Sequence, residues 1–314
     1  MSKALVIIKS MGIGDLCILI SSIHAISKKI DKSVKVLAQK NTCATAIFKH
    51  DPYVDEVIEL NEKEIKGFFS VIKKIKPRQF DQSYIFSDSI RFYLISRLSG
   101  IKQNFHYKFF SKRGKNFFKT AKAFTEKILD TKIDSQSKIY CDNNDLEEAK
   151  RKFNISNKTK NIVCGISASG PTKRWDINNY IKLFENLNSK FQCKFFLAGG
   201  QNDKDLIKKV TNSAIGNRCI SFSTMKIAET IPVISACQYY IGNDTGWGHI
   251  SSGLDLKSLF LFMDSPPSAY GVYSKNISII VPDGETIESC GHNTRKKDKI
   301  SYDEVLTKAL ELIN

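Results

Sequence analysis

Proline and tryptophan are scarce in this sequence, with seven and two copies among 314 residues. So little proline argues against a disordered or linker-rich chain. No stretch reaches the roughly 18 to 20 apolar residues that a membrane span needs. The eight cysteines include no Cys-x-x-Cys pair, and Cys290 and His292 have no second pair of ligands beside them. We therefore expect a folded cytosolic protein with reduced thiols and no metal.

The length and the charge limit the classes of protein to consider. A chain of 314 residues fits two domains of about 150 residues each. The net charge is +16, from 48 Lys and Arg against 32 Asp and Glu. Such a surface attracts nucleic acid, acidic membranes or anionic glycolipids. The excess of lysine is equally typical of an AT-rich genome, so both interpretations stay open.

The first half alternates apolar runs with amphipathic ones, which predicts βαβ units. The predicted strands are 4–9, 34–38, 54–60 and 80–86, and the predicted helices are 15–30, 42–50, 63–76 and 88–99. This order is typical of a doubly wound parallel sheet. The pattern breaks between Arg97 and Lys127, where nine Lys or Arg and seven aromatics accompany one acid, Glu126. That segment fits neither a regular strand nor a regular helix.

The second half restarts the alternation after the polar stretch 154–161. Its predicted strands are 162–167, 193–199, 218–222, 238–243, 258–262 and 277–281, with helices near 176–190, 203–213, 224–237 and 246–254. We predict an α/β fold with two Rossmann-like domains, 1–155 and 156–300. Residues 301–314 carry a last helix that we expect to pack back on the N-terminal domain.

The strand, turn and helix at the start of the chain resemble a dinucleotide-binding loop but lack its defining residues. The fingerprint needs a third glycine and an acid at the end of the second strand. Here Gly12 and Gly14 are followed by Asp15, and the second strand ends in Ala38 and Gln39. A carboxylate at a helix start repels a phosphate. Asp15 is therefore either a helix cap or a functional acid.

Three segments of the second half follow predicted strands and suit an anion. In "IGNDTGWGHISSG" (241–253), Thr245 and Gly246 begin a helix whose amides favour a phosphate, and His249 lies one turn further on. In "SASGPTKRW" (167–175), Ser169 permits close approach and Lys173 supplies a positive charge. In "LAGGQND" (197–203), Asp203 stands where a ribose hydroxyl is typically bound.

In this order the motifs resemble glycosyltransferase family 9, the heptosyltransferases that build the inner core of bacterial lipopolysaccharide. The resemblance covers essentially the whole chain. It implies the GT-B fold, in which two Rossmann-like domains face each other across a cleft, with the acceptor on the N-terminal domain and the nucleotide sugar on the C-terminal one. It also implies inverting transfer of heptose from ADP-heptose without a metal or other cofactor.

The resemblance assigns roles to individual residues. Asp15 corresponds to the general base, and Lys173 stabilises the departing diphosphate. Donor contacts fall on Ser169, Lys173, Asp203, Met225, Asp244, Thr245, Gly246 and His249, with Met225 beside the adenine and Asp244 near the sugar. An inverting transfer needs such a base, and opposite it positive charge and N–H dipoles.

Several residues depart from the family pattern around the donor pocket. Trp247 and Gly248 replace the usual leucine and serine, Asp176 follows the tryptophan where proline is common, and Thr172 stands where an acid is frequent. Gly12 adds freedom to the first loop. Another nucleotide sugar, such as an N-acetylhexosamine donor, is the alternative to ADP-heptose.

The resemblance also implies an anionic glycolipid acceptor at the cytoplasmic face of the inner membrane. We predict that 102–123 lines the acceptor side through Lys108, Lys112 and Arg113, together with Gly14, and that its exposed aromatics meet the membrane. A solvated basic loop is the alternative. A nucleic-acid-binding protein and an NAD-dependent oxidoreductase are the remaining candidates, and neither explains the 241–253 motif; we expect no nucleic-acid partner.

Overall fold

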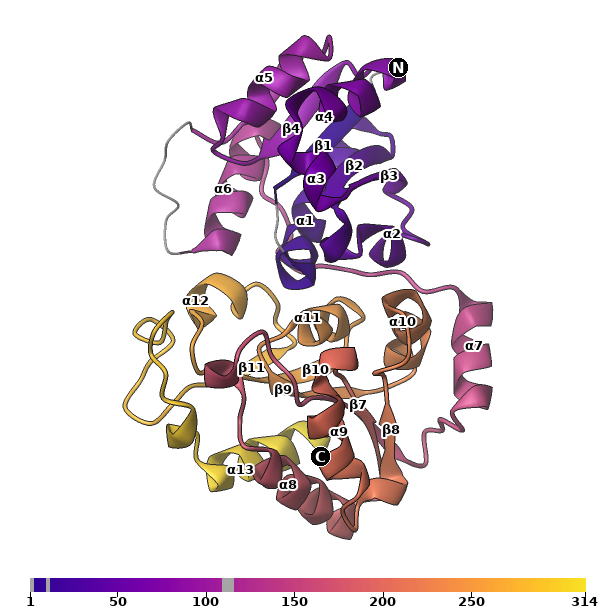
Figure 1. Cartoon of the computed structure of the whole chain (residues 1–314), viewed down its shortest axis with the longest axis vertical. Coiled ribbons are helices and arrows are strands. Elements are labelled where there is room, and N and C mark those ends of the chain that lie inside the picture. The colour runs from indigo at the N-terminus through magenta and orange to yellow at the C-terminus, as the bar shows by residue number, and fades with distance from the viewer. Residues whose placement is uncertain (1–2, 10–11, 109–115) are drawn as a thin grey trace. The chain divides into compact units, whose positions relative to one another are not determined.

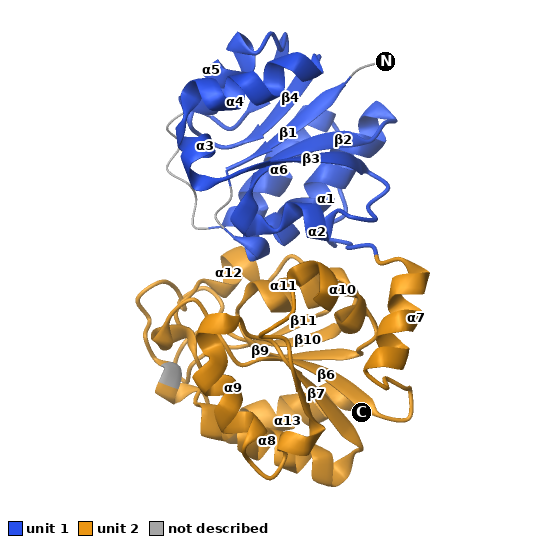
Figure 2. Ribbon diagram, turned by 45° about the vertical axis from the view of Figure 1, so that its right-hand side comes forward, with its two compact units in different colours: residues 1–140 blue, residues 141–314 orange. Residues whose placement is uncertain are grey.

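The computed structural model describes residues 3–9, 12–108 and 116–314, which divide into two units, 1–140 and 141–314 (Figure 2). The division follows Tyr140, whereas we predict a boundary after residue 155. The difference comes from helix α7 (Asn143–Lys152), which packs against α10 (Ile227–Ser235) in the second unit. Most of the polar stretch 154–161 is therefore a turn within that unit, and its last two residues begin the next strand. Turns and linkers share the same polar composition.

The first unit is built on one parallel sheet of five strands in the order β3-β2-β1-β4-β5. The strands are β1 (Ala4–Ile8), β2 (Val34–Gln39), β3 (Val54–Leu60), β4 (Gln82–Phe86) and β5 (Gln103–His106). The helices are α1 (Ile13–Ile30), α2 (Ala44–Ile47), α3 (Glu62–Lys66), α4 (Phe68–Ile75), α5 (Ile90–Leu98) and α6 (Phe117–Leu129). Helices α1 and α6 pack together on one face, and α4 and α5 on the other (Figures 1 and 2).

The sequence places β1 at the centre of this sheet because all five of its residues are apolar and buried. A strand covered on both faces reads as a continuous apolar run. Leu5 and Ile7 face the layer of α4 and α5, where they join Phe92 and Ile95 in one core. The predicted strands and doubly wound order of this unit are thus confirmed.

Two predicted helices are shorter than expected. The predicted helix 42–50 is a 3-10 turn, Lys40–Thr42, followed by the four residues of α2, because Cys43 between them has a φ of 53°. The predicted helix 63–76 divides at Gly67, which adopts extended backbone between α3 and α4. Both breaks are backbone conformations that apolar periodicity does not report.

The described parts of the basic aromatic segment, 97–108 and 116–127, form regular elements, contrary to our prediction. Strand β5 extends the sheet beside β4, and α6 packs on α1. Its described aromatics point inward: Phe105 stacks on Tyr84 at 5.0 Å between ring centroids, and Tyr107 meets Phe124 at 4.9 Å. These rings supply core rather than an exposed membrane face. Lys112 and Arg113 lie outside the described residues.

The second unit repeats the plan with six parallel strands in the order β11-β10-β9-β6-β7-β8. The strands are β6 (Lys160–Gly165), β7 (Cys193–Leu197), β8 (Cys219–Ser221), β9 (Tyr239–Asn243), β10 (Lys257–Leu261) and β11 (Ile277–Ile280). Besides α7 and α10, its helices are α8 (Ile177–Lys190), α9 (Lys204–Thr211), α11 (Gly246–Gly253), α12 (Pro267–Tyr270) and α13 (Tyr302–Ile313). The order of elements confirms the prediction for this half.

The last helix packs within its own unit, contrary to the expected return to the N-terminal domain. Helix α13 contacts α8, β9 and β10. Val305, Ala309 and Ile313 are fully buried in the core of the second unit. Residues spaced by four lie on one side of a helix, so these three side chains face the second sheet together.

The described residues hold few features of a redox or metal protein. All eight cysteines are free thiols, and burial raises the pKa of Cys164 and Cys237 well above the usual value. No group of three metal-ligating side chains occurs in the described ranges. Among the described helices, none combines the length and the apolar character that crossing a bilayer takes.

Candidate functional site

The predicted donor residues gather at one edge of the second sheet. Ser169 and Lys173 follow β6, Asp203 follows β7, and Met225 follows β8. The segment 244–249 follows β9 and begins α11. Because all these strands are parallel, their carboxyl ends meet at the edge where ligands bind in doubly wound folds (Figure 1).

The start of α11 offers unpaired backbone donors at this edge. Thr245 is the N-cap residue, and no acid occupies the first turn. The amides of Gly246 and Trp247 donate to no other described residue, whereas Gly248 and His249 donate back to the Thr245 carbonyl. Such a helix start favours an anion through its N–H groups and its dipole.

Gly248 allows α11 to lie close to the sheet. A Cβ atom at this position would come within 2.5 Å of the Phe260 ring and 2.8 Å of the Tyr240 ring. The hydroxyl of Tyr240 in turn donates to the carbonyl of Asn243 at 2.7 Å. Glycine at 248 thus accommodates two large buried rings.

Asp244 is held by two side chains from different elements. His249 Nε2 lies 3.1 Å from Asp244 Oδ1, and Ser265 Oγ donates to Asp244 Oδ2 at 2.6 Å. The other ring nitrogen, His249 Nδ1, lies 2.9 Å from the hydroxyl of Tyr273. The imidazole is buried with both nitrogens engaged, so it orients Asp244. The phosphate contact that we expect of His249 stays a prediction.

The surroundings of Asp244 keep it negatively charged. Burial opposes its ionisation, but the hydrogen bond and charge of His249, the Ser265 hydroxyl and the charge of Lys173 outweigh it, so the pKa of Asp244 lies below its ordinary value. Lys173 therefore acts electrostatically on Asp244. The carboxylate and the ammonium share one edge of the sheet.

The loop that carries Lys173 is fixed on both sides. Thr172 Oγ1 donates to Asp264 Oδ2 at 2.7 Å, which ties it to the segment after β10. Arg174 donates to the Ala168 carbonyl at 2.9 Å and to Asp203 Oδ1 at 3.3 Å. Lys173 stands between these two anchors, half-buried, on the 3-10 turn Pro171–Lys173.

Asp203 already accepts hydrogen bonds at both carboxylate oxygens. Its Oδ1 pairs with Arg174, and its Oδ2 accepts from the Gly200 amide at 2.9 Å. It thereby links the loops after β6 and β7. Ser169, in the first of these loops, is exposed.

Asn243 organises the same edge from beneath, although the sequence analysis assigned it no role. Its Oδ1 accepts from the Trp175 amide at 3.1 Å and from the Tyr180 hydroxyl at 3.0 Å. Its Nδ2 donates to the Ser167 carbonyl at 3.3 Å. The signal available in the sequence was an amide residue at the end of a buried apolar strand, where a polar group requires partners.

Apolar side chains lie where we predict the adenine of the donor to bind. Met225 is half-buried and donates its amide to the Phe222 carbonyl at 2.9 Å. The Phe222 ring lies 5.7 Å from that of Trp247, the first-turn residue of α11. An aromatic surface of this kind suits a planar ring.

Asp15 occupies the corresponding helix start in the first unit. Helix α1 begins two residues earlier than predicted, with Gly12 as N-cap and Asp15 as its third residue. Asp15 is half-buried and is not the capping residue. Its charge adds to burial in raising the pKa of Cys17. Gly14 precedes it in the same turn, and Lys108 is exposed after β5.

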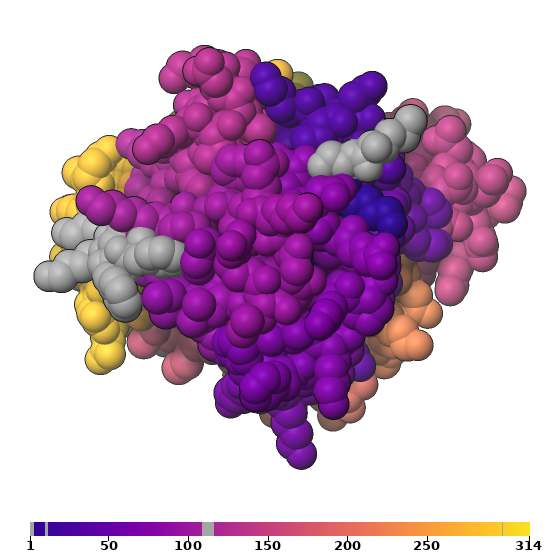
Figure 3. Space-filling model, turned by 90° about the horizontal axis from the view of Figure 1, so that it is seen from above, coloured from indigo at the N-terminus to yellow at the C-terminus, as the bar shows by residue number. Residues whose placement is uncertain are grey.

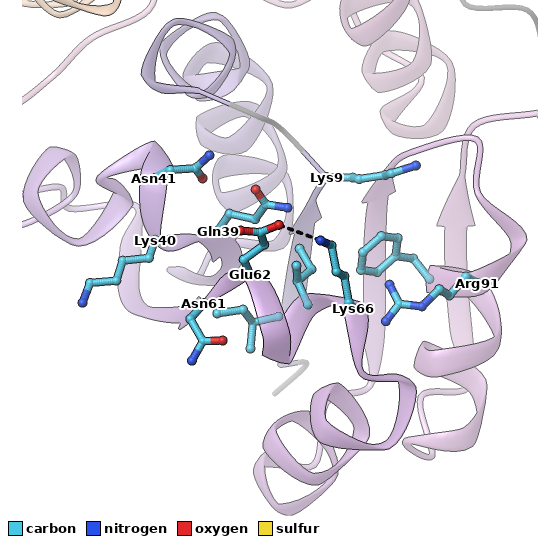
Figure 4. Close-up of a pocket in the computed structure, with 11 residues that line it drawn as sticks. Lys9, Gln39, Lys40, Asn41, Asn61, Glu62, Lys66 and Arg91 are labelled. Carbon is cyan, nitrogen blue, oxygen red and sulfur yellow. Dashed lines mark hydrogen bonds and ion pairs between the residues drawn. The ribbon is translucent and has the colours of Figure 1, made fainter. Parts of the chain in front are cut away.

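A cavity of about 760 Å³ opens at the carboxyl edge of the first sheet. Its walls come from the ends of β1, β2 and β3, the 3-10 turn Lys40–Thr42, helix α3 and the first turn of α5. The polar lining consists of Lys9, Gln39, Lys40, Asn41, Asn61, Glu62, Lys66 and Arg91. Figure 4 shows Gln39, Lys40 and Asn41 on one side of Glu62 and Lys66, with Lys9 and Arg91 on the other.

The cavity has a positive excess, because four cations line it and Glu62 is its single acid. Lys66 pairs with Glu62 at 2.6 Å (Figure 4). Arg91 Nη2 is buried without a hydrogen-bond partner among the described residues, and burial lowers the pKa of its guanidinium. An unpaired buried guanidinium nitrogen favours an anionic ligand. The sequence analysis missed this cavity because its cations are scattered over four segments.

Comparisons with known proteins agree with this architecture. The sequence model of "Glycosyltransferase family 9 (heptosyltransferase)" matches residues 69–301, which include every predicted donor residue and exclude Asp15. The chain is 20% identical over 302 residues to lipopolysaccharide heptosyltransferase 1 of Campylobacter coli, covering 88% of this chain and 87% of that protein.

Two solved structures share the fold over nearly the whole chain. A glycosyltransferase family 9 protein from Veillonella parvula has a TM-score of 0.81 and 16% identity, covering 99% of this chain and 97% of its own. E. coli ADP-heptose lipopolysaccharide heptosyltransferase II has a TM-score of 0.76 and 18% identity, covering 99% and 98%. Both confirm the predicted pair of doubly wound sheets.

Proposed function

The chain belongs to glycosyltransferase family 9, and we propose that it transfers heptose from ADP-heptose to a lipopolysaccharide core or related glycan. It is a glycosyltransferase; the sugar, the acceptor and the mechanism are the proposal. The observation that carries it is the edge of the second sheet, where Lys173 and the free amides of α11 adjoin the charged, hydrogen-bonded Asp244. That combination suits a sugar diphosphate.

In the proposed reaction the second unit binds the donor. The amides of Gly246 and Trp247 and the ammonium of Lys173 stabilise the negative charge that develops on the departing diphosphate. Thr245 adds a hydroxyl beside them, and Met225 with Trp247 supports the adenine. Ser169 and Asp203 complete the donor contacts. His249 keeps Asp244 oriented towards the sugar.

Asp15 is the proposed general base. Its carboxylate accepts the proton of the acceptor hydroxyl as that oxygen attacks the anomeric carbon from the side opposite the diphosphate, which inverts the configuration. No step in this scheme needs a metal, because Lys173 and helix amides take the place of a cation at the leaving group. Gly14 beside Asp15 leaves room for the acceptor.

The acceptor is proposed to place an anionic group in the cavity of the first unit. Its four cations and the unpaired Arg91 nitrogen suit a phosphate or sugar carboxylate. This proposal moves the acceptor contacts from the 102–123 segment towards Lys9, Lys66 and Arg91, with Lys108 at the edge strand. The protein would act at the cytoplasmic face of the inner membrane.

Thermal-shift measurements with ADP, UDP, GDP, NAD and a short RNA test the donor. We expect ADP to stabilise the fold and NAD and RNA to have no effect. Stabilisation by UDP alone would favour the alternative donor, a UDP-linked N-acetylhexosamine. Transfer assays with ADP-heptose and a water-soluble core oligosaccharide then test the reaction, and no turnover with either donor would contradict the proposal.

A further inference from the structure

Large apolar side chains are exposed on two neighbouring helices of the first unit. Phe69 on α4 is 73% exposed, and Ile90, Leu94 and Leu98 on α5 are 44%, 42% and 58% exposed. We call these four residues the apolar stripe. They are four of the six large apolar side chains that the described residues expose; Val272 and Ile287 are the others.

The apolar stripe is not needed by the core. The opposite side of α5 buries Phe92 and Ile95 against β1 and β4, so the helix is anchored without its exposed residues. Ile90, Leu94 and Leu98 repeat every four residues and follow one line along the helix for about 12 Å. Helices α4 and α5 contact each other, so Phe69 is exposed on the helix that neighbours α5.

Cations border the apolar stripe. Lys73 and Lys76 follow Phe69, and Arg97 and Lys102 lie at and beyond the end of α5; all four are exposed. None of them takes part in an ion pair among the described residues, although Arg97 donates to the Lys102 carbonyl at 2.9 Å. In Figure 3 the purple part of the chain, which includes α4 and α5, occupies the centre of the face in view.

We propose that the face of α4 and α5 docks on a membrane surface that carries anionic lipids. Exposed apolar side chains together with exposed, unpaired cations on the same helices match a bilayer interface, where the former enter between headgroups and the latter meet negative charge. A second copy of the chain is a poorer occupant, because a two-fold contact would bring the same four cations against each other.

The cavity of the first unit adjoins this face, so the inference rests on the proposed glycolipid acceptor. Arg91 and Phe92, in the first turn of α5, line the cavity, while Ile90 beside them begins the apolar stripe. A lipid-linked acceptor would keep its acyl chains in the bilayer under the stripe. Its anionic sugar would enter the cavity at the start of the same helix.

Vesicle sedimentation tests the contribution of the apolar stripe to membrane binding. The full chain is mixed with vesicles of phosphatidylglycerol and phosphatidylethanolamine, and separately with phosphatidylcholine vesicles. We expect binding to the first only. The variant Phe69→Gln/Leu94→Gln/Leu98→Gln should lose about tenfold or more in partition coefficient. The control Val272→Gln/Ile287→Gln, which removes the exposed apolar residues of the second unit, should bind like the parent.

The variant Lys73→Gln/Lys76→Gln/Arg97→Gln tests the contribution of the bordering cations to membrane binding. Each cation near an anionic surface contributes about fivefold to binding, so the loss should exceed that of the control Lys204→Gln/Lys208→Gln/Lys209→Gln. Circular dichroism confirms that each variant folds. No binding by the parent, or equal binding by the stripe variant and the parent, would overturn the inference. A concentration-dependent dimer that the stripe variant abolishes would also overturn it and identify a second copy as the occupant.

Transfer to a water-soluble acceptor separates this inference from the proposed function. We expect the stripe variant to keep parental turnover with that acceptor and to lose it only with vesicle-embedded acceptor. Vesicle binding without any sugar transfer would refute the function and leave the docking surface intact. Sugar transfer without vesicle binding would refute the docking surface and leave the proposed function intact.

Discussion

Both units start a helix after a central strand, but the acid lies at a different position relative to the helix start. In the first unit α1 carries Asp15 in its first turn, and in the second α11 has no acid there. Asp244, just before α11, is engaged by His249 and Ser265. An anion can therefore meet backbone amides in the second unit. In the first it must rely on side-chain cations, such as Lys66 and Arg91 of the cavity.

The difference teaches that a doubly wound sheet fixes where ligands bind and not which charge they carry. Both sheets present strand ends, helix starts and short loops at one edge. In the proposed reaction, the carboxylate of Asp15 at one helix start accepts a proton, and the other helix start binds the diphosphate. The predictions below test this division of roles.

The largest expected effect is that of Asp15→Asn, which keeps the shape and removes the charge. If Asp15 is the general base, turnover should fall about 10² to 10⁴-fold while ADP affinity stays within about twofold of the parent. The control Asp31→Asn makes the same change at the other end of α1. Turnover assays and calorimetry measure both, and a large loss of ADP affinity would place Asp15 in the donor site instead.

The next effect is that of Lys173→Ala in the second unit. Loss of a charged partner to the diphosphate should weaken ADP binding about 10- to 100-fold. Lys190→Ala removes an exposed lysine at the end of α8 and serves as the control. Calorimetric titration with ADP compares them. Unchanged affinity would remove Lys173 from the donor site and leave α11 as the sole anion contact.

A smaller effect is expected from His249→Phe, which keeps an aromatic ring between Asp244 and Tyr273. Asp244 then loses a donor in a buried setting, which should lower the free energy of unfolding by about 1 to 3 kcal/mol. Tyr273→Phe removes only the outer hydrogen bond and should cost less. Urea denaturation measures both variants. Equal stability of His249→Phe and the parent would show that Ser265 alone suffices for Asp244.

The smallest expected effect is the loss of stability at low pH that protonation of Asp264 causes. Burial opposes ionisation of Asp264, but hydrogen bonds from Thr172 and from the Arg295 and Asn293 amides outweigh it, so its pKa lies below the ordinary value near 4. A lowered pKa stabilises the fold at neutral pH, and this contribution is lost as the pH falls through the folded-state pKa. Above pH 5, the free energy of unfolding of the parent should therefore exceed that of Asp264→Asn by about 1 kcal/mol. Urea denaturation should show this gap closing below about pH 4, and a gap independent of pH would contradict the assignment.

Local pattern predicted most of the strands because buried parallel strands are rich in apolar residues, as in 4–8. It failed at β5, a short edge strand whose residues Gln103 and Asn104 are polar. It also failed at α6, where basic residues on the outer side obscure the buried Phe118 and Ala121. Periodicity is weakest where an element has one narrow buried face.

Within the site, the sequence identified the residues at strand ends but not the partners that orient them. Ser265 and Tyr273 are 21 and 24 residues from the groups they contact, and no motif links them. The phosphate contact expected of His249 stays a prediction, and the sequence did not indicate that its ring lies beside Asp244, packed against Phe260 and Tyr273. Three-dimensional contacts of this kind leave no local trace.

The eight free cysteines make the chain a convenient object for site-specific chemistry. Burial raises the pKa of the thiols of Cys17, Cys43, Cys164, Cys193, Cys219, Cys237 and Cys290, so at neutral pH they remain protonated and react slowly with maleimides. Cys141 is the one cysteine outside this group. In a Cys141→Ser background, a cysteine introduced by Leu98→Cys would take up a fluorescent label rapidly. A dye at that position would report directly on the polarity that α5 meets.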